Sequence, residues 1–321
     1  MTRLAILDDY QNAAGRLVDW SLLGATVEVV IFHERLVGDG LIAALVDFDI
    51  IVVMRERTLL SRDVLERLPK LRLIATNGMA NAAIDLVATK DLGILVTGTS
   101  SGLQSTVEIS WTLILSTIKE VPRANADVRS GRWQEFLPGD LAGATLGLVG
   151  LGRLGAAMVP IAKAFSLNVI AWSQNLTAER ADEIGVDLVT KADLMRESDI
   201  VSIHLRLSER TAGLIGRQEF ALMKPHAILI NTSRGPIVDE QAMVDALRDK
   251  RIGGAGLDVY DQEPVAPNHP LCALENVVLS PHLGYASEAN LRDYLSSSFD
   301  NVVAYLNGEP QRLLGRDATA H

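Results

Sequence analysis

Three polar residues in the last third of the chain carry side chains suited to hydride chemistry at a hydroxyl-bearing carbon. Arg234, Glu263 and His282 each lie at or just after a β-rich run. Hydride loss needs a base for the hydroxyl proton, and an imidazole can supply it. A carboxylate would orient that imidazole and favour its charged form, while an arginine can grip a substrate carboxylate with its planar fork. We interpret the three residues in these roles, although each taken singly could equally be a surface arginine, a loop glutamate or a buried histidine.

A glycine-rich turn lies between a predicted strand over 145–150 and a helical pattern that contains Pro160, which should kink that helix. In such a turn the first glycine permits a tight bend, the second lets the backbone approach a pyrophosphate, and the third lets the helix pack on the strand. The helix N-terminus favours negative charge. In this context the turn predicts dinucleotide binding, and without the context it would indicate only a strand–helix turn of small residues. The predicted cofactor residues here are Gly150, Gly152, Arg153, Leu154 and Gly155.

The residues after the next predicted strand bear on which dinucleotide is bound. NAD-binding folds usually place an acidic residue about 20 positions beyond the turn, where it holds the ribose hydroxyls. Here the strand over 168–172 is followed by neutral Ser173, Gln174 and Asn175, and Arg180 lies close behind. The repulsion that would exclude a 2′-phosphate is therefore missing. We expect Ser173 and Gln174 at the ribose of either NAD or NADP.

Short strands alternate with helical patterns, which predicts parallel sheets covered by helices on both faces. Their near-continuous Val, Ile and Leu content suits burial on both faces. The first set of strands is expected over 4–9, 26–32, 50–54, 71–76 and 94–98. The second set, with the six strands of a dinucleotide fold, is expected over 145–150, 168–172, 199–205, 227–232, 253–259 and 277–280.

The length of 321 residues fits two domains. We predict an α/β protein of two doubly wound parallel-sheet domains. Helical spacing over 105–120 predicts a helix that joins the domains, and helical spacing over 286–308 predicts one that returns to the first. A flavodoxin-like substrate domain is then expected over 1–99 and 288–321, and a Rossmann dinucleotide-binding domain over 100–287.

Composition argues against several other classes of protein. The net charge of −10 would repel nucleic acid and anionic lipid, and no run of 18 apolar residues indicates a membrane span. The N-terminal sequence lacks the long apolar segment of a secretory signal, and the single cysteine, Cys272, permits no intrachain disulfide, so we expect a cytoplasmic protein. The histidines show no ligand spacing, so no metal is expected. A thiol nucleophile formed by Cys272 with His282 is a minor alternative, because a lone cysteine is more often a small buried hydrophobe.

Taken together, the segments resemble the D-isomer-specific 2-hydroxyacid dehydrogenase family, which includes phosphoglycerate, glyoxylate and hydroxypyruvate reducing members. The resemblance is carried in order by GLGRLG, SDIVSIHL, LMKPHAILINTSRGPIVDE, GLDVYDQEP and SPHLGY. It implies an NAD(P)-dependent oxidoreductase that interconverts a D-2-hydroxy acid and its 2-oxoacid, with the three polar residues in the roles given above. It also implies that Asp258 faces the nicotinamide carboxamide and that Thr232 and Gly284 belong to the cofactor site.

The segment over 77–85 resembles the family's substrate loop, whose backbone N–H groups receive the carboxylate. Here it departs from the family pattern, because Ala80 and Ala83 replace a usual glycine and asparagine. We therefore expect Gly78, Met79 and Ala80 to shape an unusual substrate pocket, and the acid that fits it stays open.

Some relatives in the family are nicotinamide-sensing corepressors, so a binding protein of the same fold is an alternative that the complete set of three polar residues argues against. A formate-type dehydrogenase would have glutamine at the position of Glu263. A homodimer is expected from the family. The apolar helix over 105–120 suits either the dimer interface or packing between domains.

Overall fold

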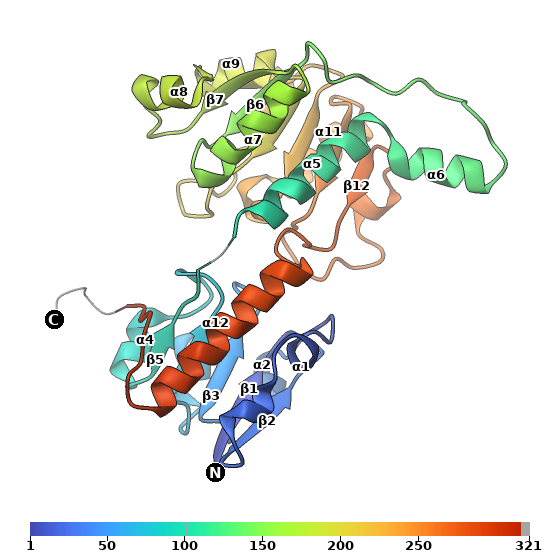
Figure 1. Cartoon of the computed structure of the whole chain (residues 1–321). Coiled ribbons are helices and arrows are strands. Elements are labelled where there is room, and N and C mark those ends of the chain that lie inside the picture. The colour runs from blue at the N-terminus through green and yellow to red at the C-terminus, as the bar shows by residue number, and fades with distance from the viewer. Residues whose placement is uncertain (101, 316–321) are drawn as a thin grey trace. The chain divides into compact units, whose positions relative to one another are not determined.

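The computed structural model of the chain describes residues 1–100 and 102–315, which form two compact units (Figure 1). Unit 1 is built from Met1–Gly102 and the chain from Ser287 onward, and unit 2 from Leu103–Ala286. Residues 101 and 316–321, which fall within the predicted domains, lie outside the described residues.

Unit 1 contains a five-stranded parallel sheet in the order β2-β1-β3-β4-β5, the order of flavodoxin-like folds. All five predicted strands are confirmed. They are β1 (Thr2–Ile6), β2 (Val27–Ile31), β3 (Ile50–Val53), β4 (Leu73–Thr76) and β5 (Leu95–Thr97). The predicted end of the first strand at residue 9 is wrong. Asp8 adopts a φ of 60°, and the Asp9 carboxylate accepts hydrogen bonds from the N–H groups of Ala13 and Ala14, so the chain turns into a helix there.

The helices of unit 1 pack around this sheet. They are α1 (Ala14–Leu17), α2 (Gly38–Leu45), α3 (Arg62–Glu66), α4 (Leu86–Asp91) and α12 (Glu288–Leu306), with a 3-10 helix η1 (Trp20–Leu23). The hydroxyl of Ser287 caps α12 by accepting a hydrogen bond from the N–H of Asn290. Leu291, Leu295 and Val302 of α12 are buried, and α12 packs against β4 and α1. The C-terminal helix predicted over 286–308 is thus confirmed within two residues at each end.

Unit 2 contains a seven-stranded parallel sheet in the order β12-β11-β10-β9-β6-β7-β8, the Rossmann order with one further strand. Its strands are β6 (Thr145–Val149), β7 (Asn168–Trp172), β8 (Asp187–Leu188), β9 (Ile200–Ile203), β10 (Ile228–Asn231), β11 (Gly254–Leu257) and β12 (Val277–Leu279). The six predicted strands are confirmed. Sequence reasoning missed β8, whose two residues are both exposed and form no apolar run.

Helices cover both faces of this sheet. They are α5 (Gln104–Ile118), α7 (Arg153–Ala164), α8 (Ala178–Ile184), α9 (Lys191–Glu197), α10 (Arg217–Leu222) and α11 (Glu240–Arg248), with 3-10 helices η2 (Gly235–Ile237) and η3 (Pro270–Ala273). One apolar cluster joins α5, α7 and α8 to the sheet, and a second joins α9, α10 and α11 to the opposite face. Helix α7 continues through Pro160, which lies on its exposed side, and the kink stays a prediction.

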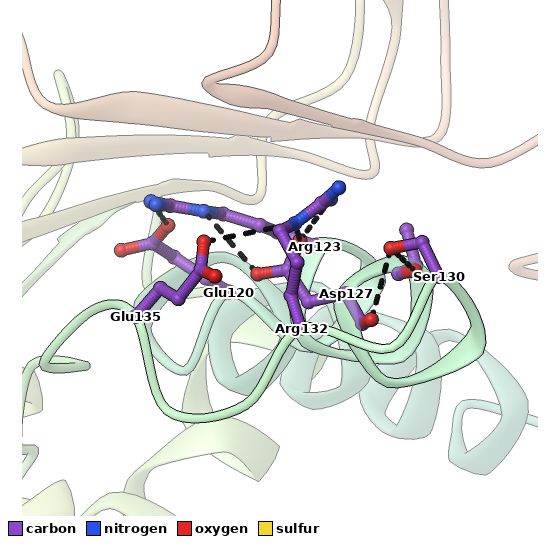
Figure 2. Close-up of polar contacts among 7 residues, drawn as sticks. Glu120, Arg123, Asp127, Ser130, Arg132 and Glu135 are labelled. Atoms are coloured by element: carbon purple, nitrogen blue, oxygen red, sulfur yellow. Dashed lines mark hydrogen bonds and ion pairs between the residues drawn. The ribbon is translucent and has the colours of Figure 1, made fainter.

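A helical arm that the sequence did not predict stands apart from the sheet of unit 2 (Figure 1). It comprises α6 (Val121–Arg129) and the chain up to residue 140. Figure 2 shows the ion pairs that hold it: Arg123 contacts Glu120 at 2.8 Å, and Arg132 pairs with Asp127 and lies 3.7 Å from Glu135. The pair between Arg132 and Asp127 links the helix to the chain that follows it.

Candidate active site

The polar residues singled out in unit 2 follow the carboxyl-terminal ends of strands in its sheet. Because all strands of this sheet are parallel, the loops after β6, β9, β10, β11 and β12 leave from the same side. Arg234 follows β10, Glu263 lies in the loop after β11, and His282 follows β12. These three strands are neighbours in the sheet, and the glycine-rich turn follows β6 at the point where the strand order reverses. Open α/β sheets bind ligands at this point.

Glu263 and His282 are in direct contact. The Nδ1 atom of His282 lies 2.7 Å from Oε2 of Glu263, and the two side chains are 18% and 22% exposed. The other carboxylate oxygen, Oε1, accepts a hydrogen bond from the N–H of Tyr260 at 3.1 Å. The carboxylate is therefore fixed by a backbone donor while it contacts the imidazole. A short, partly buried contact of this kind orients the ring and selects its tautomer.

Arg234 stands in a tightly bonded turn at the start of η2. Asn231 donates from Nδ2 to the Arg234 carbonyl oxygen at 3.0 Å and accepts at Oδ1 from the N–H of Ser233 at 3.0 Å. A Cβ atom at Gly235 would lie 2.1 Å from the carbonyl carbon of Tyr260, so only glycine fits there. The Arg234 turn is thus packed against the loop that carries Glu263.

Asp258 and Thr232 are both buried and both bonded within unit 2. The Asp258 carboxylate accepts hydrogen bonds from the N–H groups of Leu283 and Gly284 at 2.7 and 2.8 Å. Burial raises the pKa of the Asp258 carboxyl against the opposing effect of these hydrogen bonds. The Thr232 hydroxyl lies 2.8 Å from the hydroxyl of Ser110 on α5. The structure therefore places Asp258 against the His282 loop and Thr232 against α5.

The three glycines of the turn after β6 occupy different surroundings. Gly150 has a φ of 105°, and a Cβ atom there would lie 2.7 Å from the carbonyl oxygen of His204. A Cβ atom at Gly155 would lie 2.2 Å from the Gly150 carbonyl oxygen. Around Gly152, by contrast, a Cβ atom would meet nothing within 4 Å. The first and third glycines are required by packing, while the second leaves open space where a pyrophosphate can approach, before Arg153 and Leu154 begin α7.

His204 lies directly after β9 and is partly buried, with Nε2 2.9 Å from the Ser202 hydroxyl. Burial lowers the pKa of His204 to about 4, so the ring is neutral at physiological pH. It therefore adds no positive charge beside the glycine-rich turn.

The turn after β7 carries the residues predicted to lie at the ribose of the dinucleotide. The N–H of Leu176 donates to the Ser173 carbonyl oxygen at 3.1 Å, and Gln174 and Asn175 are exposed. Arg180, on α8, lies 2.8 Å from Glu183. Both side chains of this pair are more than half exposed, so the pair stabilises little and the guanidinium can exchange partners.

The predicted substrate loop lies in unit 1, after β4. Gly78 has a φ of 82°, and its N–H donates to the hydroxyl of Thr99 at 3.0 Å. Asn81 is buried and shapes the loop, because its Oδ1 accepts from the N–H of Ala83 at 3.0 Å and its Nδ2 donates to the Thr76 hydroxyl at 2.8 Å. The exposed loop residues are Met79, Ala80 and Ala82.

Comparisons with known proteins decide the family. Residues 111–284 match the model of the D-isomer specific 2-hydroxyacid dehydrogenase, NAD binding domain. The chain belongs to this family. The dehydrogenases of this family move a hydride between a nicotinamide dinucleotide and a 2-hydroxyacid/2-oxoacid pair, and the matched segment of the present dehydrogenase lies within unit 2.

Two curated relatives and a solved structure illustrate the similarity. The dehydrogenase is 42% identical over 267 residues to the glyoxylate reductase of Aeropyrum pernix, with 79% of each chain covered. It is 37% identical over 275 residues to the D-3-phosphoglycerate dehydrogenase of Methanocaldococcus jannaschii, covering 84% of this chain and 52% of that one. Its fold matches a phosphoglycerate oxidoreductase from Vibrio cholerae with a TM-score of 0.90 and 31% identity, over 96% and 100% of the two chains.

The resemblance and the α/β fold inferred from the sequence are thus confirmed. Within the part of the chain that the structure describes, no helix is long and apolar enough to cross a bilayer. Among these same described residues, no group of three or more His, Cys, Asp or Glu side chains is placed to hold a metal ion.

Proposed function

We propose that this dehydrogenase reduces a 2-oxoacid to the D-2-hydroxy acid, and catalyses the reverse reaction, with His282 as the acid/base. The observation that carries the proposal is the 2.7 Å contact between His282 Nδ1 and Glu263 Oε2. It turns Nδ1 toward the carboxylate and leaves Nε2 as the nitrogen that exchanges a proton with the substrate oxygen. The bound dinucleotide supplies or accepts the hydride.

The other residues take the roles that their chemistry supports. In reduction the imidazolium of His282 gives its proton to the carbonyl oxygen, and the negative charge of Glu263 stabilises the imidazolium before that transfer. Arg234 binds the substrate carboxylate through two parallel N–H donors and polarises the adjacent carbonyl. In unit 1 the backbone at Gly78, Met79 and Ala80 contributes to substrate binding.

Unit 2 binds the dinucleotide in this proposal. The open space at Gly152 and the N-terminus of α7 support a pyrophosphate site there. The full set of proposed cofactor residues is Gly150, Gly152, Arg153, Leu154, Gly155, Ser173, Gln174, Thr232, Asp258 and Gly284.

The substrate is tested with a panel of 2-oxoacids, including glyoxylate, hydroxypyruvate and bulkier acids, each assayed by loss of reduced-nicotinamide absorbance. We expect turnover of at least one member. Chirality of the product, determined on a chiral column, then checks the D configuration for every acid whose product is chiral. An L product would contradict the proposed geometry.

We further propose that NADPH is accepted at least as well as NADH. No acid stands at Ser173, and Arg180 on the next helix can exchange Glu183 for a 2′-phosphate. Ser173→Asp is expected to lower kcat/KM for NADPH at least about tenfold, or 1.4 kcal/mol, because its carboxylate repels the 2′-phosphate. The measurement is kcat/KM for both reduced cofactors. Ser173→Ala keeps the site neutral and should retain the wild-type ratio, whereas a strong preference of the wild type for NADH would exclude NADP as the cofactor.

A cytoplasmic homodimer completes the proposal. The exposed free thiol of Cys272 fits a reducing compartment. Trp111, Leu113 and Ile114 of α5 are buried in the unit's own core, so that helix offers little apolar surface to a second chain. The arm instead presents Trp133 at 73% and Leu137 at 95% exposure, as an interface would.

We therefore expect light scattering to give twice the 34.7 kDa of one chain. The double substitution Trp133→Lys with Leu137→Lys should give the mass of one chain, because two charges would be buried in an apolar contact. Leu22→Lys is the matched control, since Leu22 is 73% exposed but lies in unit 1. A monomeric wild type would contradict the dimer, and a double variant that stays dimeric would exclude the arm.

A further inference from the structure

The backbone at His282 adopts a conformation that needs support from its surroundings. His282 has a φ of 56°, in the left-handed region that residues with a Cβ atom rarely occupy. Such a conformation persists only where neighbouring contacts determine it. The residues that hold the loop from 280 to 284 therefore decide where the imidazole points.

Asp258 holds the chain immediately after His282. Its two carboxylate oxygens accept the N–H groups of Leu283 and Gly284, the two residues that follow the histidine. A Cβ atom at Gly284 would lie 3.0 Å from Oδ2 of Asp258, so the glycine lets the backbone approach the carboxylate closely.

Tyr260 holds the chain just before His282. Its hydroxyl lies 2.9 Å from the carbonyl oxygen of Ser280, two residues before the histidine, and 3.2 Å from that of Leu257 at the end of β11. The side chain is buried, and burial raises the pKa of the phenol, so the hydroxyl keeps its proton and can donate. The side chain thus ties the His282 loop to β11.

The same residue also fixes the partner of the histidine. The backbone N–H of Tyr260 donates to Oε1 of Glu263, and Oε2 of Glu263 contacts Nδ1 of His282. One residue therefore contacts both the carboxylate and the loop that carries the imidazole. The side-chain hydroxyl fixes the position of the His282 loop, and the backbone N–H fixes the orientation of the Glu263 carboxylate.

We propose that Tyr260 is a positioning residue, whose hydroxyl holds the His282 loop in register with Glu263. The inference rests on the proposed function of His282 as the acid/base. Phenylalanine would fill the same space and keep the backbone N–H, but it would leave the Ser280 carbonyl oxygen without the phenolic donor. Tyr260→Phe therefore isolates the hydroxyl.

The experiment compares wild type with Tyr260→Phe in the full chain. We expect kcat for a 2-oxoacid to fall about tenfold, the KM for the reduced dinucleotide to stay within twofold, and the midpoint of the pH profile of kcat to move. In nitrogen-15 NMR of histidine-labelled protein, with the His282 signals identified by their loss in His282→Asn, the share of the Nδ1–H tautomer should fall. This spectrum reports the tautomer of the His282 ring directly and does not depend on turnover.

Ser198→Ala is the matched control in unit 2. It also deletes a buried hydroxyl, which donates to the carbonyl oxygen of Leu194 at 2.6 Å. Ser198 lies just before β9, at the amino-terminal end of the strands and therefore away from the His282 loop. It should leave the pH profile and the His282 spectrum unchanged. If Tyr260→Phe behaves like Ser198→Ala in both readouts, the positioning role is overturned. Full turnover by His282→Asn would overturn the proposed function instead, while the ring spectrum would still decide whether Tyr260 positions the imidazole.

Discussion

Replacing His282 by alanine is expected to lower kcat for 2-oxoacid reduction by about a hundredfold to ten-thousandfold, because a positioned acid contributes that much to proton transfer. The dissociation constant of the reduced dinucleotide should stay within about twofold of wild type, since the variant removes the proton donor and leaves the glycine-rich turn intact. Stopped-flow measurement of hydride transfer, with dinucleotide binding followed by fluorescence, separates the two effects.

The chain offers a matched control for this variant. His269 lies 3.1 Å from Glu240, and the two side chains are 21% and 24% exposed, close to the values for His282 and Glu263. His269→Ala should leave kcat unchanged, because this pair is not expected to contact the substrate. Normal turnover by His282→Ala would refute the mechanism. A wild-type chain that binds the dinucleotide but turns over none of the 2-oxoacids would favour the corepressor alternative.

The fold was predictable where apolar runs are long. The strands buried on both faces stand out as Val, Ile and Leu segments between helical patterns, and their alternation implies parallel pairing. β8 was missed because a two-residue exposed strand has no such pattern. α6 was missed for a related reason. It begins after Glu120, whose φ is 48°, and has few apolar residues of its own, so it lacks the buried apolar stripe by which a helix is recognised in a sequence.

The site was predictable only where residue type alone implies chemistry. Glu263 and His282 could be named because a carboxylate beside an imidazole has a recognisable use, and the structure places them in contact. Tyr260 could not, since its hydroxyl and backbone N–H act on loops 20 and 3 positions away. Gly235 escaped notice because its constraint is the backbone of Tyr260. Roles that arise from packing between loops leave no pattern in a single sequence.

Arg234→Gln is expected to lower kcat/KM for a 2-oxoacid by about a hundredfold to a thousandfold, because two charge-assisted hydrogen bonds to the substrate carboxylate contribute roughly 3–4 kcal/mol. Arg234→Lys keeps the charge without the planar fork and should recover part of the loss. The decisive measurement repeats the assay with a small aldehyde that lacks the carboxylate. For that substrate wild type and Arg234→Gln should differ much less, whereas Arg196→Gln, on an exposed pair with Asp193, should change neither activity. An equal loss with the aldehyde would mean that Arg234 stabilises the Glu263 loop, against which its turn packs at Gly235, and that the substrate carboxylate is bound elsewhere.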